Sequence, residues 1–557
     1  MTALIRPVPL TGADRARPLR IIVLLLAQAA ILGWIYRANW GDHFRFVMGD
    51  TYDNTIEASI LEHWYNVLRG LASWSRTNYF HPYQLTLGYN DGYFLYGLLY
   101  APFRAAGADP FLAATLVHMT MKAAGFLFFY GFARTVLRLP FGYALTGAAL
   151  FELASGISVH TMHAQLLTVA LAPLCATLLY GAWQAWAARQ PRRLLGFGCA
   201  FALTYGAWAM TAFYMLWFFS LLVALVLLVL AVFHWRVLGA TLRQSDRATR
   251  GAALLCLLAV VLSLCPFLLV YLPKARETGM HQFTNASSYA LAPFDILNFG
   301  PGNYLYGAVL PSLNAAIGFP IAWGENQAGT TPGLLLGFIA GGIYLWRTRR
   351  TALVTAIAVA AVAMWALALI VHGHTLWYLV FKAVPGAKAI RVVARCLLML
   401  AVPMGAVALV ALAAATRGRS YWIQATAGAI CLFLVGEQLN RVSYTAIERA
   451  PVMAQLERIA PAPARCQAFV ADDARPLAPG QGQADRVYRH NVDAMLIAEF
   501  INLPTINGYS SFNPPGWDLA NPQLPDYPAR AASYAQRHNL AGLCHLELAT
   551  MTWSAAR

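Results

Sequence analysis

Long apolar runs alternate with short polar segments along most of the chain. Runs of roughly 17 to 25 apolar residues can cross a bilayer as one helix, and the sequence contains about eleven. The apolar stretch from Leu194 to Phe233 is too long for one span, and we place a tight hairpin at Met210-Thr211. This pattern predicts an α-helical polytopic membrane protein with spans near 21–39, 110–133, 141–158, 164–187, 194–210, 212–233, 252–272, 332–346, 352–371, 391–415 and 421–438.

The pattern changes near residue 440, where hydropathy drops and Pro, Asp, Asn and Gln become frequent. Alternating residues at 466–470 and 543–548 predict strands, and periodic segments near 492–501 and 527–538 predict helices. We therefore divide the chain into a membrane domain, 1–439, and a small α/β tail domain, 440–557. If the two strands are adjacent, Cys466 and Cys544 come within bonding reach and could form one disulfide in an oxidising compartment, or they could remain free thiols.

Composition agrees with a membrane protein and indicates its orientation. The chain is 59% hydrophobic and 11% charged, and its mean hydropathy is +0.53. The net charge of +16 comes from Arg clusters between apolar runs, which mark topology and argue against nucleic-acid binding. We expect an uncleaved first span, a cytoplasmic N-terminus and an extracytoplasmic tail in the cell inner (plasma) membrane. The basic flanks include Arg6, Arg15, Arg17 and Arg20, and the predicted inner loops contain Arg134, Arg138, Arg189, Arg192, Arg193, Arg236, Arg243, Arg247, Arg250, Arg347, Arg349, Arg350, Arg417 and Arg419.

Three predicted outer loops are too long to be simple turns. They cover residues 40–109, 273–331 and 372–390, and the last contains a short interfacial helix pattern around Leu376 to Val380. Long loops in compact proteins are usually functional or disordered, and the high aromatic content of these loops argues against disorder.

The first outer loop contains an acidic stretch. Asn54 and Glu57 have the spacing of a capping box, and the residues after them predict an amphipathic helix lying on the membrane surface. A helix start explains Asp53. Asp50 precedes the predicted cap and has no expected local backbone role, so it is the leading catalytic candidate. The alternative is that Asp50 is an acidic residue of an interfacial loop without a catalytic function.

Ionisable residues also occur within or beside the predicted spans. His118 and Lys122 share a helical face, and Glu152 on the next span is their expected partner, either as a buried ion pair that fixes packing or as part of a substrate site. His160 and His163 are three residues apart in an outer loop. As metal ligands they would need carboxylate help, most plausibly from Asp50 or Asp53.

Two outer arginines form a second candidate site. Arg391 and Arg395 are four residues apart, which would place them on one face as the tenth predicted span begins. Arginine at this surface runs against the usual charge bias. A guanidinium pair at a helix start suits phosphate binding, whereas the simpler alternative is that both side chains reach lipid headgroups.

Several blocks together resemble the integral-membrane glycosyltransferases of the C superfamily (GT-C), in particular bacterial members with a soluble C-terminal tail. The resemblance is distributed over most of the chain. It rests on Gly49-Asp50 before a helix, the segment from Phe80 to Leu87, His163-Ala164-Gln165-Leu166-Leu167, Pro385-Gly386 through Arg395, and Ile506 to Pro515.

The resemblance implies transfer of a sugar from a polyprenyl-phosphate donor to a glycan, lipid or protein acceptor at the outer membrane face. Asp50 would be the general base, and Arg391 and Arg395 would hold the carrier phosphate. The wider set of expected substrate-binding residues also contains Asp53, Asp91, Lys122 and His163. No metal site or cofactor is assigned, although a divalent metal is possible.

Two departures from the family pattern and two other functions bear on this interpretation. Asp50 and Asp53 lack the one-residue spacing of the Asp-any-Asp motif, which puts metal dependence in doubt. The Trp-Trp-Asp motif of oligosaccharyltransferases is absent from the sequence, which argues against Asn-linked transfer. A transporter or lipid flippase is the main alternative, and a non-catalytic assembly protein that retains the fold is a third.

Overall fold

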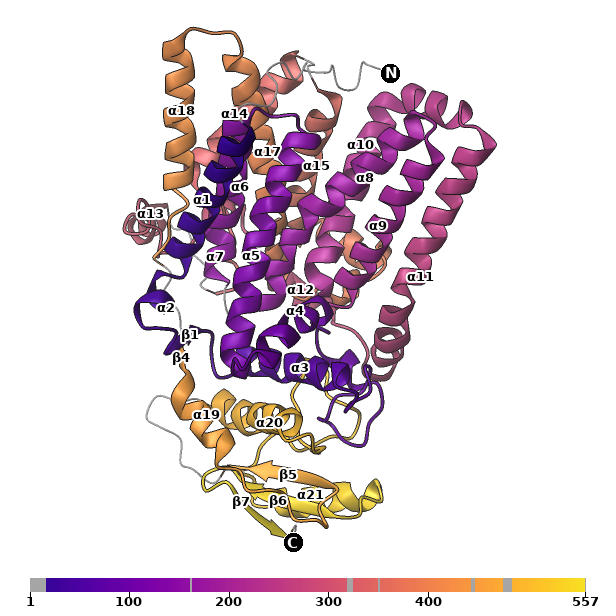
Figure 1. Cartoon of the computed structure of the whole chain (residues 1–557), viewed down its shortest axis with the longest axis vertical. Coiled ribbons are helices and arrows are strands. Elements are labelled where there is room, and N and C mark those ends of the chain that lie inside the picture. Colours follow the sequence, from indigo (N-terminus) through magenta and orange to yellow (C-terminus); the bar gives the residue numbers. More distant parts are fainter. Residues whose placement is uncertain are drawn as a thin grey trace.

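The computed structural model describes residues 17–160, 163–317, 324–348, 351–441, 446–473 and 483–555. Arg6, Arg15, Arg349 and Arg350, counted above among the basic flanks and loops, lie outside these ranges. A bundle of long helices carries the tail at one end, and the hairpin loops α10–α11 and α17–α18 lie at the other end (Figure 1).

Helices occupy all eleven predicted apolar runs. Seven helical segments in the described part of the chain are long and apolar enough to cross a membrane. This agrees with a polytopic helical membrane protein, while the predicted count of eleven exceeds the seven that meet both criteria. The helices at the eleven predicted runs are α1 (Arg17–Ile35), α5 (Pro110–Thr135), α6 (Phe141–Leu153) with α7 (Ser155–Val159), η2 (Ala164–Ala170) with α8 (Leu171–Ala187), α9 (Pro191–Ala209), α10 (Phe213–Arg243), α11 (Arg247–Thr278), α14 (Pro332–Thr348), α15 (Ala352–Ala368), α17 (Cys396–Thr416) and α18 (Tyr421–Gly436).

Shorter elements fill the loops between these helices. The short helix expected in the third outer loop is present as α16, and its place at the membrane interface stays a prediction. The remaining elements before the tail are α2 (Arg37–Gly41), β1 (Phe46–Met48), α3 (Asp53–Leu68), η1 (Thr86–Tyr89), α4 (Phe94–Ala105), α12 (Phe283–Ser287), η3 (Pro293–Leu297), α13 (Leu310–Ile317), β2 (Ile370–Val371), β3 (His374–Thr375), α16 (Trp377–Ala383), η4 (Ala387–Ala389) and η5 (Val393–Arg395).

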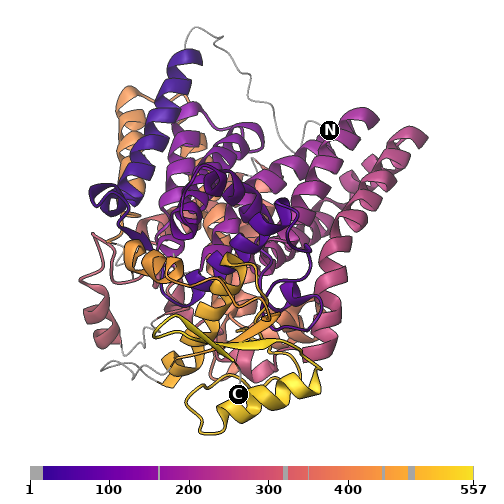
Figure 2. The same cartoon turned by 60° about the horizontal axis from the view of Figure 1, so that its bottom comes forward.

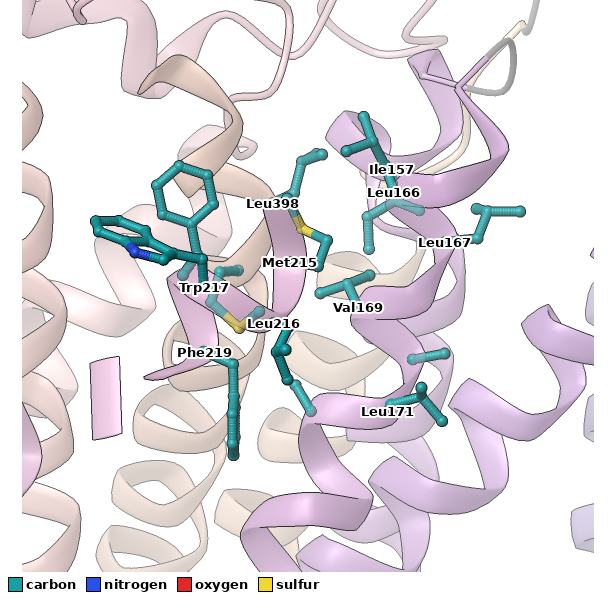
Figure 3. Packing of buried hydrophobic residues seen from close by; sticks show 14 of the residues in the cluster. Ile157, Leu166, Leu167, Val169, Leu171, Met215, Leu216, Trp217, Phe219 and Leu398 are labelled. Atoms are coloured by element: carbon teal, nitrogen blue, oxygen red, sulfur yellow. The ribbon is translucent and has the colours of Figure 1, made fainter. Parts of the chain in front are cut away.

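The predicted hairpin at Met210-Thr211 is confirmed, since α9 ends at Ala209 and α10 begins at Phe213. Close to this turn, a buried apolar cluster joins η2, α10 and α17 (Figure 3). Burying a large apolar side chain stabilises a soluble protein by about 1.5 to 3 kcal/mol, and in a bilayer close packing has the corresponding role. The cluster therefore fixes the starts of η2, α10 and α17, which lie close in sequence to His163, Tyr214 and Arg395.

Helix α3 is not the membrane-surface helix that the sequence predicted. Twelve of its 16 residues are buried, and it lies between the bundle and helix α20 (Gln483–Phe500) of the tail. The capping box is also wrong, because α3 begins at Asp53 and the Glu57 carboxylate instead lies 2.6 Å from His118 Nε2 on α5. His118 is thus paired with Glu57 rather than with Glu152. The polar face of α3 is covered by protein instead of water, so the amphipathic pattern did not indicate a helix at the membrane surface.

The tail has the expected small α/β fold. Its sheet has the order β5-β6-β7, in which β5 (Ala468–Asp472) runs parallel to β6 (Leu543–Glu547) and β7 (Thr552–Ala555) runs antiparallel to β6. Helices α19 (Arg449–Glu457), α20 and α21 (Tyr527–Arg537) complete it. Cys466 and Cys544 are bonded, with a Cα–Cα distance of 5.6 Å.

The tail is joined to the first outer loop by backbone hydrogen bonds. Strand β1 pairs with β4 (Ala446–Glu448), and the Phe80 and His81 amides donate to Asn507 O and Thr505 O at 2.8 and 2.9 Å. The buried Glu499 carboxylate accepts from the Asn78 amide at 2.6 Å. Viewed from this end, the tail lies across the loops of the bundle (Figure 2). The boundary at 439/440 remains a prediction, and strand pairing crosses it.

Candidate functional site

The Asp50 carboxylate caps helix α3. Its Oδ1 accepts from the backbone amides of Tyr52 at 2.9 Å and Asn54 at 3.4 Å, and Asn54 Oδ1 accepts from the Asp50 amide at 2.9 Å. The expectation that Asp50 has no local backbone role is therefore wrong. Gly49 permits the turn, because its φ is +136° and a Cβ there would lie 2.4 Å from the Asn54 side chain.

The environment of Asp50 favours its protonated form. Burial raises the pKa of this carboxyl above its ordinary value, and the nearby charge of Asp53 raises it further, while the backbone N–H groups act in the opposite direction. A carboxylate with a raised pKa is a stronger base once ionised, so Asp50 retains the chemistry expected of a general base.

Asp53 begins a chain of charged groups that ends in a buried arginine. Its Oδ2 lies 3.0 Å from His163 Nδ1, and His163 Nε2 lies 3.4 Å from Glu325 Oε1. Glu325 in turn accepts two hydrogen bonds from Arg395, from Nε at 2.9 Å and from Nη2 at 2.8 Å. The chain connects α3, the loop before η2, the second outer loop and the start of α17. Four segments far apart in sequence thus meet at one end of the bundle.

The two carboxylates control the charge of His163. Burial disfavours the imidazolium, but hydrogen bonding to Asp53 and Glu325 prevails and raises the pKa of His163 to about 9. Burial also acts to raise the pKa of Glu325, yet His163 and Arg395 hold it well below its ordinary range. The site therefore contains charges of alternating sign at neutral pH.

A pH-dependent contribution to stability follows from His163. Because its folded pKa lies above the ordinary value of 6.5, its charge stabilises the protein fully below pH 6.5, and this is lost as pH rises through about 9. We expect His163→Gln to reduce stability by on the order of 3 kcal/mol at pH 6, with the difference shrinking towards pH 10. Thermal unfolding of both proteins in detergent between pH 5.5 and 10 measures it.

The exposed His374 on β3 provides the control for this experiment. We expect His374→Gln to unfold at nearly the wild-type temperature throughout the range. A difference between wild type and His163→Gln that stays constant with pH would mean that His163 contributes by packing rather than by charge.

Arg391 and Arg395 do not share a helical face. Helix α17 begins at Cys396, and the backbone at Ile390 and Val392 is extended. Arg395 is buried and lies 5.0 Å from the centre of the Tyr214 ring, whereas the half-buried Arg391 lies 5.6 Å from the Tyr289 ring. The Tyr214 hydroxyl accepts from the Arg391 amide at 2.9 Å, so the two arginines remain parts of one site.

Asp91 also lies near Arg395. Its Oδ1 accepts from the Phe213 amide at 3.3 Å, at the start of α10, which is a favourable place for a carboxylate. Burial raises the pKa of Asp91 to about 6, and the Phe213 amide and the charge of Arg395 partly offset this. Helix capping is sufficient to explain Asp91, and its predicted substrate contact stays a prediction.

Lys122 does not join this cluster. Its Nζ donates to the backbone oxygen of Glu152 at 3.3 Å, and the Glu152 carboxylate accepts from Gln28 at 2.9 Å. The adjoining cavity measures about 20 Å³, which is room for roughly one water. This geometry suits the packing alternative, because it ties together α1, α5 and α6.

A metal ion would find ligands at His160, His163 and Glu325, each of which offers one ligand atom within 4.8 Å of the others. The metal hypothesis also required a carboxylate from Asp50 or Asp53 near the histidines, and Asp53 does contact His163. However, Arg395 occupies both oxygens of Glu325, and a buried guanidinium opposes a second cation. The residues present form an ion-pair network, and this set is a poor fit to a metal.

Sequence reasoning missed Glu325 as a site residue and Tyr214 as the link between the arginines. Glu325 offered one signal, as one of the 24 acidic residues of the chain and a member of a long outer loop. Tyr214 offered none, because an aromatic residue at the start of an apolar run is ordinary.

Comparisons with known proteins leave the family of this chain open. No protein-family model matches it, and no curated protein does. Among solved structures it is similar to a cryo-EM structure of arabinofuranosyltransferase AftD from Mycobacteria, at 12% identity and a TM-score of 0.44. The alignment covers 90% of this chain and 32% of that one, so the chain spans about a third of the length of that protein.

Proposed function

We propose that this protein is a membrane glycosyltransferase that moves a hexosyl or pentosyl group from a polyprenyl-phosphate donor to an acceptor at the outer membrane face. One observation carries the proposal. A series of charged side chains, Asp53, His163, Glu325 and Arg395, connects the Asp50 loop to the two arginines at one end of the bundle. A general base and a phosphate-binding group are the two parts that such a transfer needs.

In this proposal Asp50 removes the proton from the acceptor hydroxyl, which attacks the anomeric carbon with inversion. The polyprenyl phosphate leaves with the electron pair of the glycosidic C–O bond. Since Glu325 already binds Arg395, the first phosphate contact falls to Arg391, and Arg395 supplies fixed positive charge behind it.

An apolar cavity of about 420 Å³ supports a lipid-linked donor. It lies within the bundle, and its volume is that of a typical ligand pocket. Its lining runs from Met399 on α17, about one helical turn beyond Arg395, to His234 and Leu238 towards the α10–α11 loop, and a lipid chain whose head lies at the Met399 end would have its phosphate near the arginines. Its lining side chains include Phe132, Leu179, Phe219, Leu222, Ile357 and Met399.

The test is transfer by the purified protein. We expect the protein in detergent to consume a polyprenyl-phosphate sugar and release polyprenyl phosphate in the presence of acceptor glycans or lipids from envelope extracts. Failure with a panel of pentosyl and hexosyl donors, together with movement of a lipid-linked sugar between the leaflets of proteoliposomes, would replace the proposal with a flippase.

Arg391 can be tested by binding alone. We expect Arg391→Ala to lower the affinity for polyprenyl phosphate about tenfold or more, because a hydrogen bond to a charged group contributes roughly 1.5 to 3 kcal/mol. Fluorescence titration of the detergent-solubilised protein measures this. Arg69→Ala is the matched control, since Arg69 lies 5.3 Å from the Tyr65 ring much as Arg391 lies beside Tyr289. Equal affinities in wild type and Arg391→Ala would remove Arg391 from the phosphate site.

A further inference from the structure

The tail sheet presents three possible metal ligands on one face. On β6, His545 and Glu547 alternate with the buried Cys544 and Leu546, so the first two share the more exposed side. Asp472 lies directly across from Glu547 in the parallel register of β5 and β6. Like charges directly opposite each other destabilise a strand pair, and here the His545 imidazole beside Asp472 and the Ala549 amide, which donates to Glu547 at 2.9 Å, offset part of this repulsion.

The ligand atoms of these residues converge. His545 Nε2 lies 2.8 Å from Asp472 Oδ1, and one atom from each of the three residues lies within 4.8 Å of the others. Ligand atoms around a tetrahedral zinc ion are about 3.4 Å apart, so small side-chain movements bring these three to such an ion.

The second nitrogen of His545 is already oriented. His545 Nδ1 lies 3.1 Å from the Ser554 hydroxyl oxygen on the neighbouring strand β7. When Nδ1–H donates to this oxygen, an ion that binds Nε2 displaces the proton that Nε2 otherwise shares with Asp472 Oδ1 at 2.8 Å. Metal-binding histidines almost always have such a hydrogen bond, which fixes the tautomer and the ring orientation.

We propose that Asp472, His545 and Glu547 bind a divalent transition-metal ion of the Zn²⁺ class, with a water as the fourth ligand. One imidazole and two carboxylates are ligands that this ion accepts. The ion connects β5 to β6, the strand that also carries Cys544 of the tail disulfide, and the hydrogen bond to Ser554 extends the site to β7. The sheet lies on the side of α20 away from the bundle, so the site is separate from His160, His163 and Glu325 (Figure 1).

The experiment counts zinc on the full-length protein in detergent. Protein stripped with a chelator is dialysed against micromolar Zn²⁺, and elemental analysis gives the bound metal per chain, with thermal unfolding measured in parallel. We expect Asp472→Asn and His545→Gln each to lose one zinc relative to wild type and to lose the zinc-dependent rise in unfolding temperature. His374→Gln and His163→Gln keep the tail zinc.

Ser554→Ala retains all three ligands, so a loss of zinc affinity in this variant cannot be attributed to a missing ligand. The Cys466–Cys544 bond reports whether its tail is folded. We expect its zinc affinity to fall about tenfold or more, while the Cys466–Cys544 bond still forms. The proposal is overturned if wild type binds no zinc, if Asp472→Asn and His545→Gln hold as much as wild type, or if Ser554→Ala binds with unchanged affinity. Each outcome is independent of sugar transfer.

Discussion

Asp50→Asn lowers the rate of sugar transfer by roughly 10²- to 10⁴-fold, the usual contribution of a general base. The substitution separates two roles of this residue. Asn retains a side-chain oxygen that can accept from the Tyr52 and Asn54 amides, so the cap of α3 persists, but it cannot take a proton from the acceptor. The rate of polyprenyl phosphate release by purified protein, at saturating donor, measures the effect.

Asp246→Asn is the matched control. Asp246 also caps a helix, accepting from the Thr249 amide at 2.7 Å, but it lies at the α10–α11 loop, away from the tail. We expect this variant to transfer sugar at the wild-type rate. If Asp50→Asn does the same, Asp50 is a cap and not a base.

The pH profile gives a second readout of Asp50. A base acts in its ionised form, so we expect wild-type transfer to decline as pH falls through the raised Asp50 pKa, above the range of an ordinary Asp. The charge of Asp53 contributes to the raised pKa, and Asp53→Asn should move this decline to lower pH. A profile unchanged in Asp53→Asn would assign the decline to another group.

Glu325→Gln destabilises the protein by about 3 to 5 kcal/mol, because it leaves the buried guanidinium of Arg395 without its counter-charge. The effect exceeds that of a lost surface ion pair, since only 7% of the Arg395 side chain and 19% of the Glu325 side chain are exposed. Thermal or denaturant unfolding in detergent measures it. The double variant Glu325→Gln/Arg395→Met removes both charges and should recover part of the loss.

The exposed pair of Asp526 and Arg530 provides the control. Asp526→Asn should leave the unfolding temperature nearly unchanged, because solvent screens such pairs. A Glu325→Gln protein as stable as wild type would show that Arg395 is solvated by other groups.

Local patterns made the elements of this fold predictable, and long-range packing did not follow from them. The break between α9 and α10 and helix α16 were predicted from periodicity over a few residues, whereas the bond between Cys466 and Cys544 depended on two strands being adjacent, which the sequence left open. In contrast, the burial of α3 depends on α20, which lies more than 400 residues later. An amphipathic pattern has the same appearance whether its polar face meets water or a second domain.

The same distinction explains the candidate site. The sequence named Asp53 and His163 and anticipated a contact between their loops, but it assigned Asp53 to the cap that Asp50 provides. The Glu325–Arg395 pair joins the second long loop to the start of α17, and one sequence contains no signal for such a pairing. The sequence therefore identified site residues where a charged or imidazole side chain was unusual beside an apolar run. It did not identify which of these residues contact each other.

The backbone pairing between the first outer loop and the tail affects how this protein can be divided or recombined. Removing everything after residue 440 would strip β1 of its partner strand and leave Asn66 and Asn78 without the Glu499 groups that they contact. A chimaera that exchanges the tail must therefore take residues 46–48 and 78–81 from the same parent. The first outer loop and the tail therefore form one structural unit that has to be exchanged together, even though more than 300 residues of chain separate them.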